Sequence, residues 1–365
     1  MYINLIGQRN IFGGGIHYGN FCDALKKLNL FGGFIREIGT SLSELSSLSE
    51  SARLADIHIF FYPPSEQVSL KGFVVKWGIF ETTKLPAQYV EWLSDCHLIW
   101  VPSRWAKNVL VEHGIPDDVI DVVPEGVDPN IFHPHLREMM VKDNVFRFYC
   151  CGKKEDRKGF PELLEAFHDT FAHDKTVQLV FKADNFWSDS VRKTDKSNEL
   201  RAEIKELDLN NVTIISGEKA TTELAYINSF CDAFVFPSRA EGWGLPLIEA
   251  IACGLPVAAN FYGGQSEYLE SVIEYITCLD FNKKRIDSVE FIDMWGEGGE
   301  WAVATKASIS ESMLHMKENY ELAHARAAVA SEVIRERFSW DKAAEKAILS
   351  LKNRDRFKLS LSLNI

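Results

Sequence analysis

The sequence predicts an α/β fold built from two doubly wound, Rossmann-like domains. Three observations carry this prediction: short apolar segments alternate with helical ones, the alternation occurs twice, and a proline-rich segment separates the two series. The 365 residues, of which 46% are hydrophobic, suffice for two domains that each bury a core. We place the N-terminal domain at 1–135, the C-terminal domain at 136–335, and a helix with a tail at 336–365.

The N-terminal series begins with a short buried strand over 2–6 and a glycine-rich loop over 7–20. Phe21, Leu25 and Leu28 follow at helical spacing. Two more helices are expected, one from Pro86 toward Ser94 and one capped by Ser103 that ends near Gly114. Further strands are predicted over 57–62, 73–79, 97–101 and 119–123.

The second series starts after residues 124–135, a segment with three prolines that is typical of a linker. Its strands are predicted over 146–151, 177–183, 211–215, 232–237 and 256–260, with a helix over 161–171, and residues 308–351 are mostly helical by composition. In open parallel sheets, ligands bind beyond the carboxyl ends of the strands. We therefore expect a site in a cleft between the two facing domains.

Composition excludes several classes of function. With 40 Lys and Arg against 52 Asp and Glu, the net charge of −12 disfavours general nucleic-acid binding. The seven cysteines show no metal-binding or disulfide spacing, which is typical of reduced thiols. The start of the chain lacks the pattern of a signal peptide, and no apolar run is long enough to cross a bilayer. We expect a cytoplasmic protein.

The most informative segment is PSRAEGWGLPLIEAIACGLPV, residues 237–257, which directly follows a predicted strand. A helix is expected to start at Leu245 or Pro246, and a helix N-terminus preceded by glycines favours an anion. Glu241 precedes the turn, and Glu249 is expected in the first turn of the helix. A carboxylate accepts two hydrogen bonds and can hold a vicinal diol. A phosphate with a diol on each side describes a nucleotide sugar.

A second segment, GKKEDRKG over 152–159, places Lys153, Lys154, Arg157 and Lys158 within six residues of an otherwise acidic chain. Such a cluster suits the neutralisation of a diphosphate. The usual D-x-D carboxylate pair that holds a divalent ion is missing, so we expect neither a metal nor another cofactor. A solubilising surface loop is the alternative interpretation, and it weighs more for Lys154 and Arg157 than for Lys158.

At these residues the sequence resembles a retaining GT-B glycosyltransferase of glycosyltransferase family 4, the glycosyl transferases group 1 type. The E-x7-E element corresponds to Glu241 and Glu249, and the family's basic pair corresponds to Lys153 and Lys158. Segments 101–128 and 338–351 resemble the family's run into its linker and its closing helix, which returns to the N-terminal domain. The resemblance spans roughly residues 1–351.

The resemblance implies that the enzyme moves a hexose from a nucleoside-diphosphate sugar to a hydroxyl of a glycan or lipid-linked glycan, as in polysaccharide biosynthesis. Glu249 would hold the ribose, Glu241 would contact sugar hydroxyls, and Lys153 and Lys158 would stabilise the leaving diphosphate. The remaining donor contacts would come from Gly14, Gly15, Gly242, Trp243, Gly244 and Leu245. The sequence of the EGWGLP turn suggests a slight preference for GDP-mannose over a UDP-sugar.

One departure from the family concerns a histidine that many members carry after a middle N-terminal strand. The comparable segment here is GIFETTKLP, so we expect Glu81 to line the acceptor or sugar site. His17 is more simply a packed or solvated histidine than a base.

Three alternatives stay open. A nucleotide-sugar epimerase of the same fold and a catalytically inactive sugar-binding homologue are two of them. The third is weak peripheral contact with the inner membrane face through the basic-apolar tail that starts at Lys352.

Overall fold

The computed structural model describes residues 2–10, 13–28, 34–40, 54–63, 70–140, 143–183, 197–295 and 298–354. The chain divides into two compact units, which are described separately. Unit 1 comprises Met1–Gly126 and Phe338–Ile365 with the short segment Trp295–Glu297. Unit 2 comprises Val127–Met294 and Gly298–Arg337. Apart from that short segment, the chain passes through unit 2 in one stretch and returns to unit 1 for α15, the helix over Trp340–Lys352.

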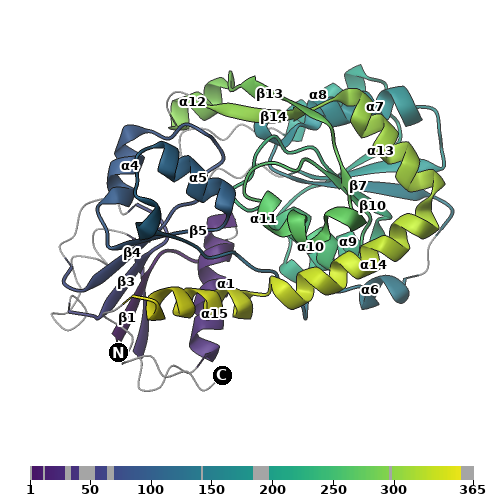
Figure 1. The fold of residues 1–365 in the computed structure, drawn as a ribbon. Coiled ribbons are helices and arrows are strands. Elements are labelled where there is room, and N and C mark those ends of the chain that lie inside the picture. Colours follow the sequence, from purple (N-terminus) through teal and green to yellow (C-terminus); the bar gives the residue numbers. More distant parts are fainter. Residues whose placement is uncertain are drawn as a thin grey trace. The chain divides into compact units, whose positions relative to one another are not determined.

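Unit 1 is built around a six-stranded parallel sheet with the strand order β2-β1-β3-β4-β5-β6 (Figure 1). Its strands are β1 (Tyr2–Ile6), β2 (Phe34–Ile38), β3 (Ile57–Phe60), β4 (Phe73–Trp77), β5 (Leu98–Val101) and β6 (Ile120–Val122). Its helices are α1 (Gly13–Lys27), α4 (Ala87–Ser94), α5 (Arg104–Glu112) and α15 (Trp340–Lys352), with the 3-10 turn η1 (Asp117–Val119). The expected strands are present, and the sheet has one more, β2.

The glycine-rich segment differs from the prediction. We expected a loop through Asn20, but α1 already begins at Gly13. Glycine is a poor helix former, so packing rather than propensity decides the start of this helix. A Cβ atom at Gly15 would lie 2.2 Å from the side-chain oxygen of Asn10, which shows how closely the preceding loop approaches the helix.

The last helix, α15, lies beside α1 within unit 1 (Figure 1). Trp340 stacks on the ring of His17 with ring centroids 5.7 Å apart. The hydroxyl of Ser350 accepts a hydrogen bond from Trp100 Nε1 at 2.8 Å and donates one to Asp121 at 2.5 Å. The predicted return of the C-terminal helix to the N-terminal domain is therefore confirmed.

Unit 2 contains a second six-stranded parallel sheet, with the order β12-β11-β10-β7-β8-β9. Its strands are β7 (Phe146–Gly152), β8 (Val177–Ala183), β9 (Val212–Ile215), β10 (Ala233–Phe236), β11 (Val257–Ala259) and β12 (Thr277–Cys278). An antiparallel hairpin adds β13 (Phe281–Arg285) and β14 (Glu300–Ala304). Aromatic and aliphatic side chains of β7, β8 and the helix that follows β7 form a buried core, which includes Phe148, Phe160, Leu163, Phe167 and Phe181.

The helical elements of unit 2 connect its parallel strands and extend the chain toward its end. They are α6 (His135–Glu138), η2 (Asp156–Lys158), α7 (Phe160–Phe171), α8 (Ser197–Glu206), α9 (Thr221–Phe230), α10 (Leu245–Ala252), α11 (Ser266–Leu269), η3 (Glu270–Tyr275), α12 (Val289–Trp295), α13 (Lys306–Glu318) and α14 (Tyr320–Arg337). The α/β alternation that the sequence predicts is thus present in both units.

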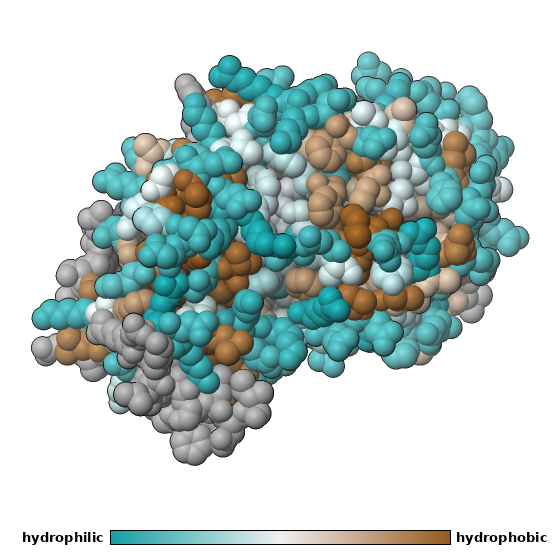
Figure 2. Space-filling model, viewed as in Figure 1, coloured by the Kyte–Doolittle hydropathy of each residue, from teal (hydrophilic) through white to brown (hydrophobic). Residues whose placement is uncertain are grey.

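The surface agrees with the acidic, mixed composition. On the face shown in Figure 2, hydrophilic residues predominate and apolar residues form small separate groups. Among the helices that the structure describes, none combines the length and the apolar character needed to span a membrane. The basic tail lies mostly outside the described residues. Arg354, its last described residue, forms an ion pair with Asp121 at 2.9 Å.

Candidate active site

The two predicted donor-binding segments of unit 2 meet because their strands are neighbours. β7 and β10 pair in parallel, so the segments 153–159 and 237–244, which follow these strands, leave the same edge of the sheet. The backbone N–H of Arg239 donates to the carbonyl of Arg157 at 2.7 Å. Gly159 has a φ of +66°, and a Cβ atom there would lie 2.4 Å from the carbonyl oxygen of Pro237, so only glycine fits.

Glu241 is the centre of a buried ion network on this edge. Its Oε1 accepts from Lys158 Nζ at 2.5 Å and from the hydroxyl of Ser238. Its Oε2 lies 2.9 Å from Arg157 Nη1, which also donates to the carbonyl of Ala240 at 2.7 Å. Arg157 Nη2 also donates to Glu155 Oε2 at 3.3 Å, so the cluster joins two cations to two carboxylates.

Electrostatics fixes the charge state of this network. Burial by itself would raise the pKa of Glu241, but Arg157 and Lys158 outweigh it and lower the pKa to about 2. Glu241, Arg157 and Lys158 are each less than 10% exposed. Buried charges of this kind persist only when they are paired and hydrogen-bonded, as they are here.

The turn before α10 shapes the adjoining backbone. Gly244 adopts a φ of +89° and caps the helix, and its carbonyl accepts a hydrogen bond from Tyr268 at 3.1 Å. The buried Trp243 ring packs edge-on against the Tyr268 ring, with centroids 4.9 Å apart. α10 begins at Leu245, as predicted. The N-terminal end of α10, the positive end of its dipole, therefore lies at the sheet edge where Arg157 and Lys158 lie.

Glu249 lies in the second turn of α10 rather than in the first. The protein atoms packed around its partly exposed side chain desolvate the carboxyl and raise its pKa to about 8. Tyr149 and Cys151 of β7 lie close enough for the Glu249 carboxylate to raise their pKa values. The two glutamates of the E-x7-E element thus have opposite environments: Glu241 is a paired carboxylate, and Glu249 favours its neutral form.

The four cations of segment 153–158 separate into different environments. Lys154 forms a partly buried ion pair with Glu203 of α8 at 2.7 Å. Lys153 is half-buried just after β7. Arg157 and Lys158 contact Glu241, as described above. The surface-loop alternative weighed more for Arg157 and Lys154 than for Lys158, but the burial of Arg157 beside Glu241 makes it part of the candidate site. Its position next to Lys158 is the signal that could have found it.

The remaining predicted residues belong to unit 1. Gly14 and Gly15 lie in the first turn of α1. A Cβ atom at Gly14 would lie 2.9 Å from the Tyr62 ring, so this glycine leaves room for that side chain. Glu81 follows β4 and is half-buried. Its carboxylate lies near enough to raise the pKa of the buried Glu125.

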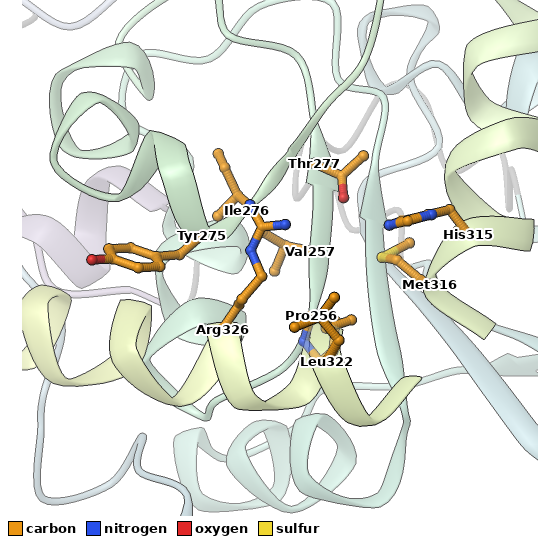
Figure 3. Close-up of a pocket in the computed structure, with 10 residues that line it drawn as sticks. Pro256, Val257, Tyr275, Ile276, Thr277, His315, Met316, Leu322 and Arg326 are labelled. Atoms are coloured by element: carbon orange, nitrogen blue, oxygen red, sulfur yellow. The ribbon is translucent and has the colours of Figure 1, made fainter. Parts of the chain in front are cut away.

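The pocket in Figure 3 is a separate feature of unit 2. It lies where β11 and β12 begin, at the opposite edge of the sheet from Glu241, and Arg326, His315 and Leu322 from α13 and α14 line it. Its volume of about 20 Å³ accommodates one water molecule, not a nucleotide sugar. Among the described residues, no group of three or more His, Cys, Asp or Glu side chains is arranged to hold a metal ion.

Comparisons with known proteins give a family match for the region that contains the Glu241 ion network. Residues 138–276 match the family described as Glycosyl transferases group 1. The chain is 27% identical to mannosylfructose-phosphate synthase of Agrobacterium fabrum over 47% of this chain and 39% of that protein. It is also 27% identical to the MMP alpha-(1->4)-mannosyltransferase of Mycolicibacterium hassiacum, over 54% and 44% of the two chains. It thus spans about two fifths of the length of these curated relatives.

Solved structures share the fold across nearly the whole chain. HepE from Anabaena, solved with UDP and glucose, superposes with a TM-score of 0.70 at 14% identity and covers 97% of this chain and all of its own. Sucrose-phosphate synthase from Thermosynechococcus elongatus gives a TM-score of 0.72 at 14% identity over 96% and 98% of the two chains. Residues 138–276 are thus similar to the glycosyl transferases group 1, and the two Rossmann-like units have the GT-B fold.

Proposed function

We propose that this protein is a retaining hexosyltransferase that moves a sugar from a nucleoside diphosphate to a hydroxyl of a glycan or lipid-linked glycan, without a metal ion. The family match and the names of the relatives, which include mannosyl- and glucosyltransferases, support the class of reaction. A cytoplasmic location follows as part of the same proposal, because nucleotide sugars would be its donors.

The single observation that carries the proposal is the cluster of Arg157, Lys158 and Glu241 at the carboxyl edge of β7 and β10. Glycosyl transfer from a nucleotide sugar develops negative charge on the departing diphosphate. Fixed cations and helix N-terminal amides stabilise such charge most when they are already in place. Arg157 and Lys158 supply the cations, and the start of α10 supplies a helix N-terminus at the same edge of the sheet.

We propose that the reaction is a front-face transfer. The bond from the anomeric carbon to the diphosphate oxygen breaks, the acceptor oxygen attacks from the same side, and the departing phosphate takes the acceptor proton. Both oxygens of Glu241 already accept from Ser238, Lys158 or Arg157, which argues against this carboxylate as a covalent nucleophile. Glu241 instead positions the two cations, and Glu249 would hold the ribose hydroxyls.

The donor is proposed as GDP-mannose, with a UDP-sugar as the alternative. A mannosyltransferase among the relatives supports the first, and the UDP and glucose seen in the HepE structure support the second. Glu249 serves either donor in the same way, because both carry ribose.

The test is a panel of nucleotide sugars scored by thermal shift and by release of the nucleoside diphosphate, each with and without EDTA. We expect one donor to raise the melting temperature and to be turned over equally in both conditions. A melting temperature that no donor changes would refute a donor site. Loss of turnover in EDTA would refute metal independence alone.

A further inference from the structure

The segment that carries Glu241 is held from two sides. β10 lies between β7 and β11 in the parallel sheet of unit 2, so residues 237–244 run between the segments that follow those two strands. Arg157 and Lys158 meet this segment from the β7 side, as described above. Residues 260–265, which follow β11 and are called the β11 segment here, meet it from the other side.

Asn260 joins three segments through one side-chain amide. It directly follows β11, and none of its surface is exposed. Its Nδ2 donates to the carbonyl of Ser238 at 3.0 Å and to the carbonyl of Ala302 in β14 at 2.9 Å. Its Oδ1 has no hydrogen-bond partner within the described part of the chain. The surrounding backbone therefore uses the two N–H groups and not the oxygen, and an aspartate of the same shape could not make these bonds.

The backbone of the β11 segment lies directly against the turn at Glu241. The N–H of Gly264 donates to the carbonyl of Glu241 at 2.7 Å. A Cβ atom at Gly264 would lie 1.7 Å from the carbonyl oxygen of Gly242, so only glycine permits this approach. The fully buried Gln265 closes the segment, because its Nε2 donates to the carbonyl of Asn260 at 2.5 Å. The β11 segment thus fixes the backbone on which Glu241 stands.

Ser238 connects the Asn260 amide to the buried ion network. Its carbonyl accepts from Asn260, and its hydroxyl donates to Glu241 Oε1. β14 is fixed to the same segment, since the N–H of Ala302 donates to the carbonyl of Arg239 at 2.9 Å. Loss of the Asn260 amide would remove a donor from the buried Ser238 carbonyl and release the Glu241 segment on the side that faces β11.

We propose that Asn260 is a positioning residue of the transfer reaction. Through Ser238 it holds Glu241 in place, and Glu241 in turn holds Arg157 and Lys158 toward the departing diphosphate. Asn260 acts through these groups and needs no contact with the donor. This inference rests on the proposed function and adds to it a residue that no motif of the sequence indicated.

The position of Asn260 predicts which kinetic constant it controls. Cations that stabilise a departing diphosphate act most strongly when charge develops in the transition state, and their effect depends on exact placement. A displacement of about 1 Å in such groups can lower a rate about 100-fold. The ribose is assigned to Glu249, in the second turn of α10. We therefore expect Asn260 to affect kcat and to leave donor binding nearly unchanged.

The experiment uses the full chain with its preferred nucleotide sugar. Asn260→Asp keeps the shape of the side chain but places an oxygen against two carbonyls, and kcat should fall at least tenfold. KM for the donor should change less than threefold. The affinity and stoichiometry of nucleoside-diphosphate binding, measured by titration calorimetry, should also stay within threefold, which shows that the variant is folded. Asn260→Ala removes the amide without adding a charge and should lower kcat at least fivefold. An unchanged kcat in either folded variant would overturn the inference.

Asn211 provides the matched control. Its Nδ2 also donates to backbone carbonyls, those of Phe171 at 2.8 Å and Val177 at 3.0 Å, but Asn211 directly precedes β9 and lies at the amino edge of the same sheet. Asn211→Asp makes the same chemical change away from the ion network and should leave kcat within twofold of the wild type. An equal fall in kcat in N211D and N260D would indicate a general loss of structure and would overturn the inference.

A double mutant tests whether Asn260 acts through the ion network. In a Lys158→Met background, Asn260→Asp should lower kcat less than threefold further, because a cation that Asn260 positions has been removed. A further fall as large as in the wild-type background would overturn the inference. A wild type that transfers no sugar from any nucleotide donor would instead refute the proposed function, so the two failures are distinguishable.

Discussion

Glu241 Oε2 and Arg157 Nη1 lie 2.9 Å apart in an ion pair that joins the segments following β10 and β7. Arg157 also donates to the carbonyl of Ala240, and its own carbonyl accepts from the backbone of Arg239. The pair therefore fixes the backbone of one segment against that of the other, and it presents Lys158 beside the start of α10.

Removal of the Glu241 charge should destabilise unit 2. Glu241→Gln leaves Lys158 buried without a counter-charge and leaves Arg157 with Glu155 alone, and breaking a buried pair in this way costs about 3–5 kcal/mol. Urea unfolding should report a loss of free energy of that order. Glu203→Gln is the matched control, because the more exposed Lys154–Glu203 pair should contribute less than about 1 kcal/mol. Equal losses of unfolding free energy in the two variants would contradict the assignment of Glu241 as the centre of the buried ion network.

Lys158 should matter for the donor and Lys154 should not. Lys158→Met removes a fixed positive charge from the site, and we expect kcat/KM for the donor to fall about 100-fold, which is typical of the loss of one preorganised charge-stabilising group. Lys154→Met removes a neighbouring lysine whose ammonium is committed to Glu203 and should change kcat/KM less than about threefold. Steady-state kinetics with the preferred nucleotide sugar measures both variants. A similar fall in kcat/KM for both would refute the assignment of Lys158 to the donor site.

Glu249 should give the stability of the protein a specific pH dependence. The folded carboxyl, with its pKa raised to about 8, keeps a proton that the unfolded chain releases near the ordinary value of 4.5. Between these pH values the free energy of unfolding must fall as the pH rises, by at most about 1.4 kcal/mol per pH unit.

The comparison is made between the wild type and Glu249→Gln from pH 5 to 8. The variant lacks the titration, so its stability relative to the wild type should rise across the window. Glu311→Gln, at an exposed position on α13, serves as the control. Its free energy of unfolding should change with pH in parallel with that of the wild type. A constant difference between E249Q and the wild type would show that Glu249 titrates normally.

Ser350 should couple α15 to the sheet of unit 1. Ser350→Ala leaves Trp100 Nε1 buried without its partner, which costs about 1–3 kcal/mol, and it also removes a hydrogen bond to Asp121. A double-mutant cycle with Trp100→Phe measures the interaction directly. We expect a coupling energy above about 0.5 kcal/mol, and additive losses would mean that the hydrogen bond contributes nothing.

Local signals predicted the parts of the fold that depend on neighbouring residues. Ser103 accepts a hydrogen bond from the backbone of Ala106 and starts α5, and α10 begins at Leu245 after a left-handed glycine, both as expected. β8 has the bounds that its apolar run predicts. In each case the residues that decide the structure lie within a few positions of one another.

The features that the sequence did not reveal depend on distant partners. β2 carries Arg36 and Glu37, and the Glu37 carboxylate is bonded to Arg9, so this edge strand lacks a plain apolar run. The helical start at Gly13 follows from close packing against the loop before it. Arg157 has an ordinary surface composition around it, and only the pairing of β7 with β10 brings it to Glu241. The E-x7-E spacing predicted two similar carboxylates, whereas burial and cations give them opposite charge states.

The path of the chain determines the order in which the two units can be completed during synthesis. Unit 2 is complete once α14 has been made, but unit 1 needs α15 as well as its first strands, because Trp100 and Ser350 are hydrogen-bonded although they lie 250 positions apart. During synthesis, the surface of α1 that packs against α15 therefore stays exposed to solvent until α15 has left the ribosome. Domains generally fold as units during synthesis, so the N-terminal unit matures last although it begins first. An isolated N-terminal fragment would be an incomplete fold, whereas a circular permutant that joins α15 to β1 would restore it as one continuous segment.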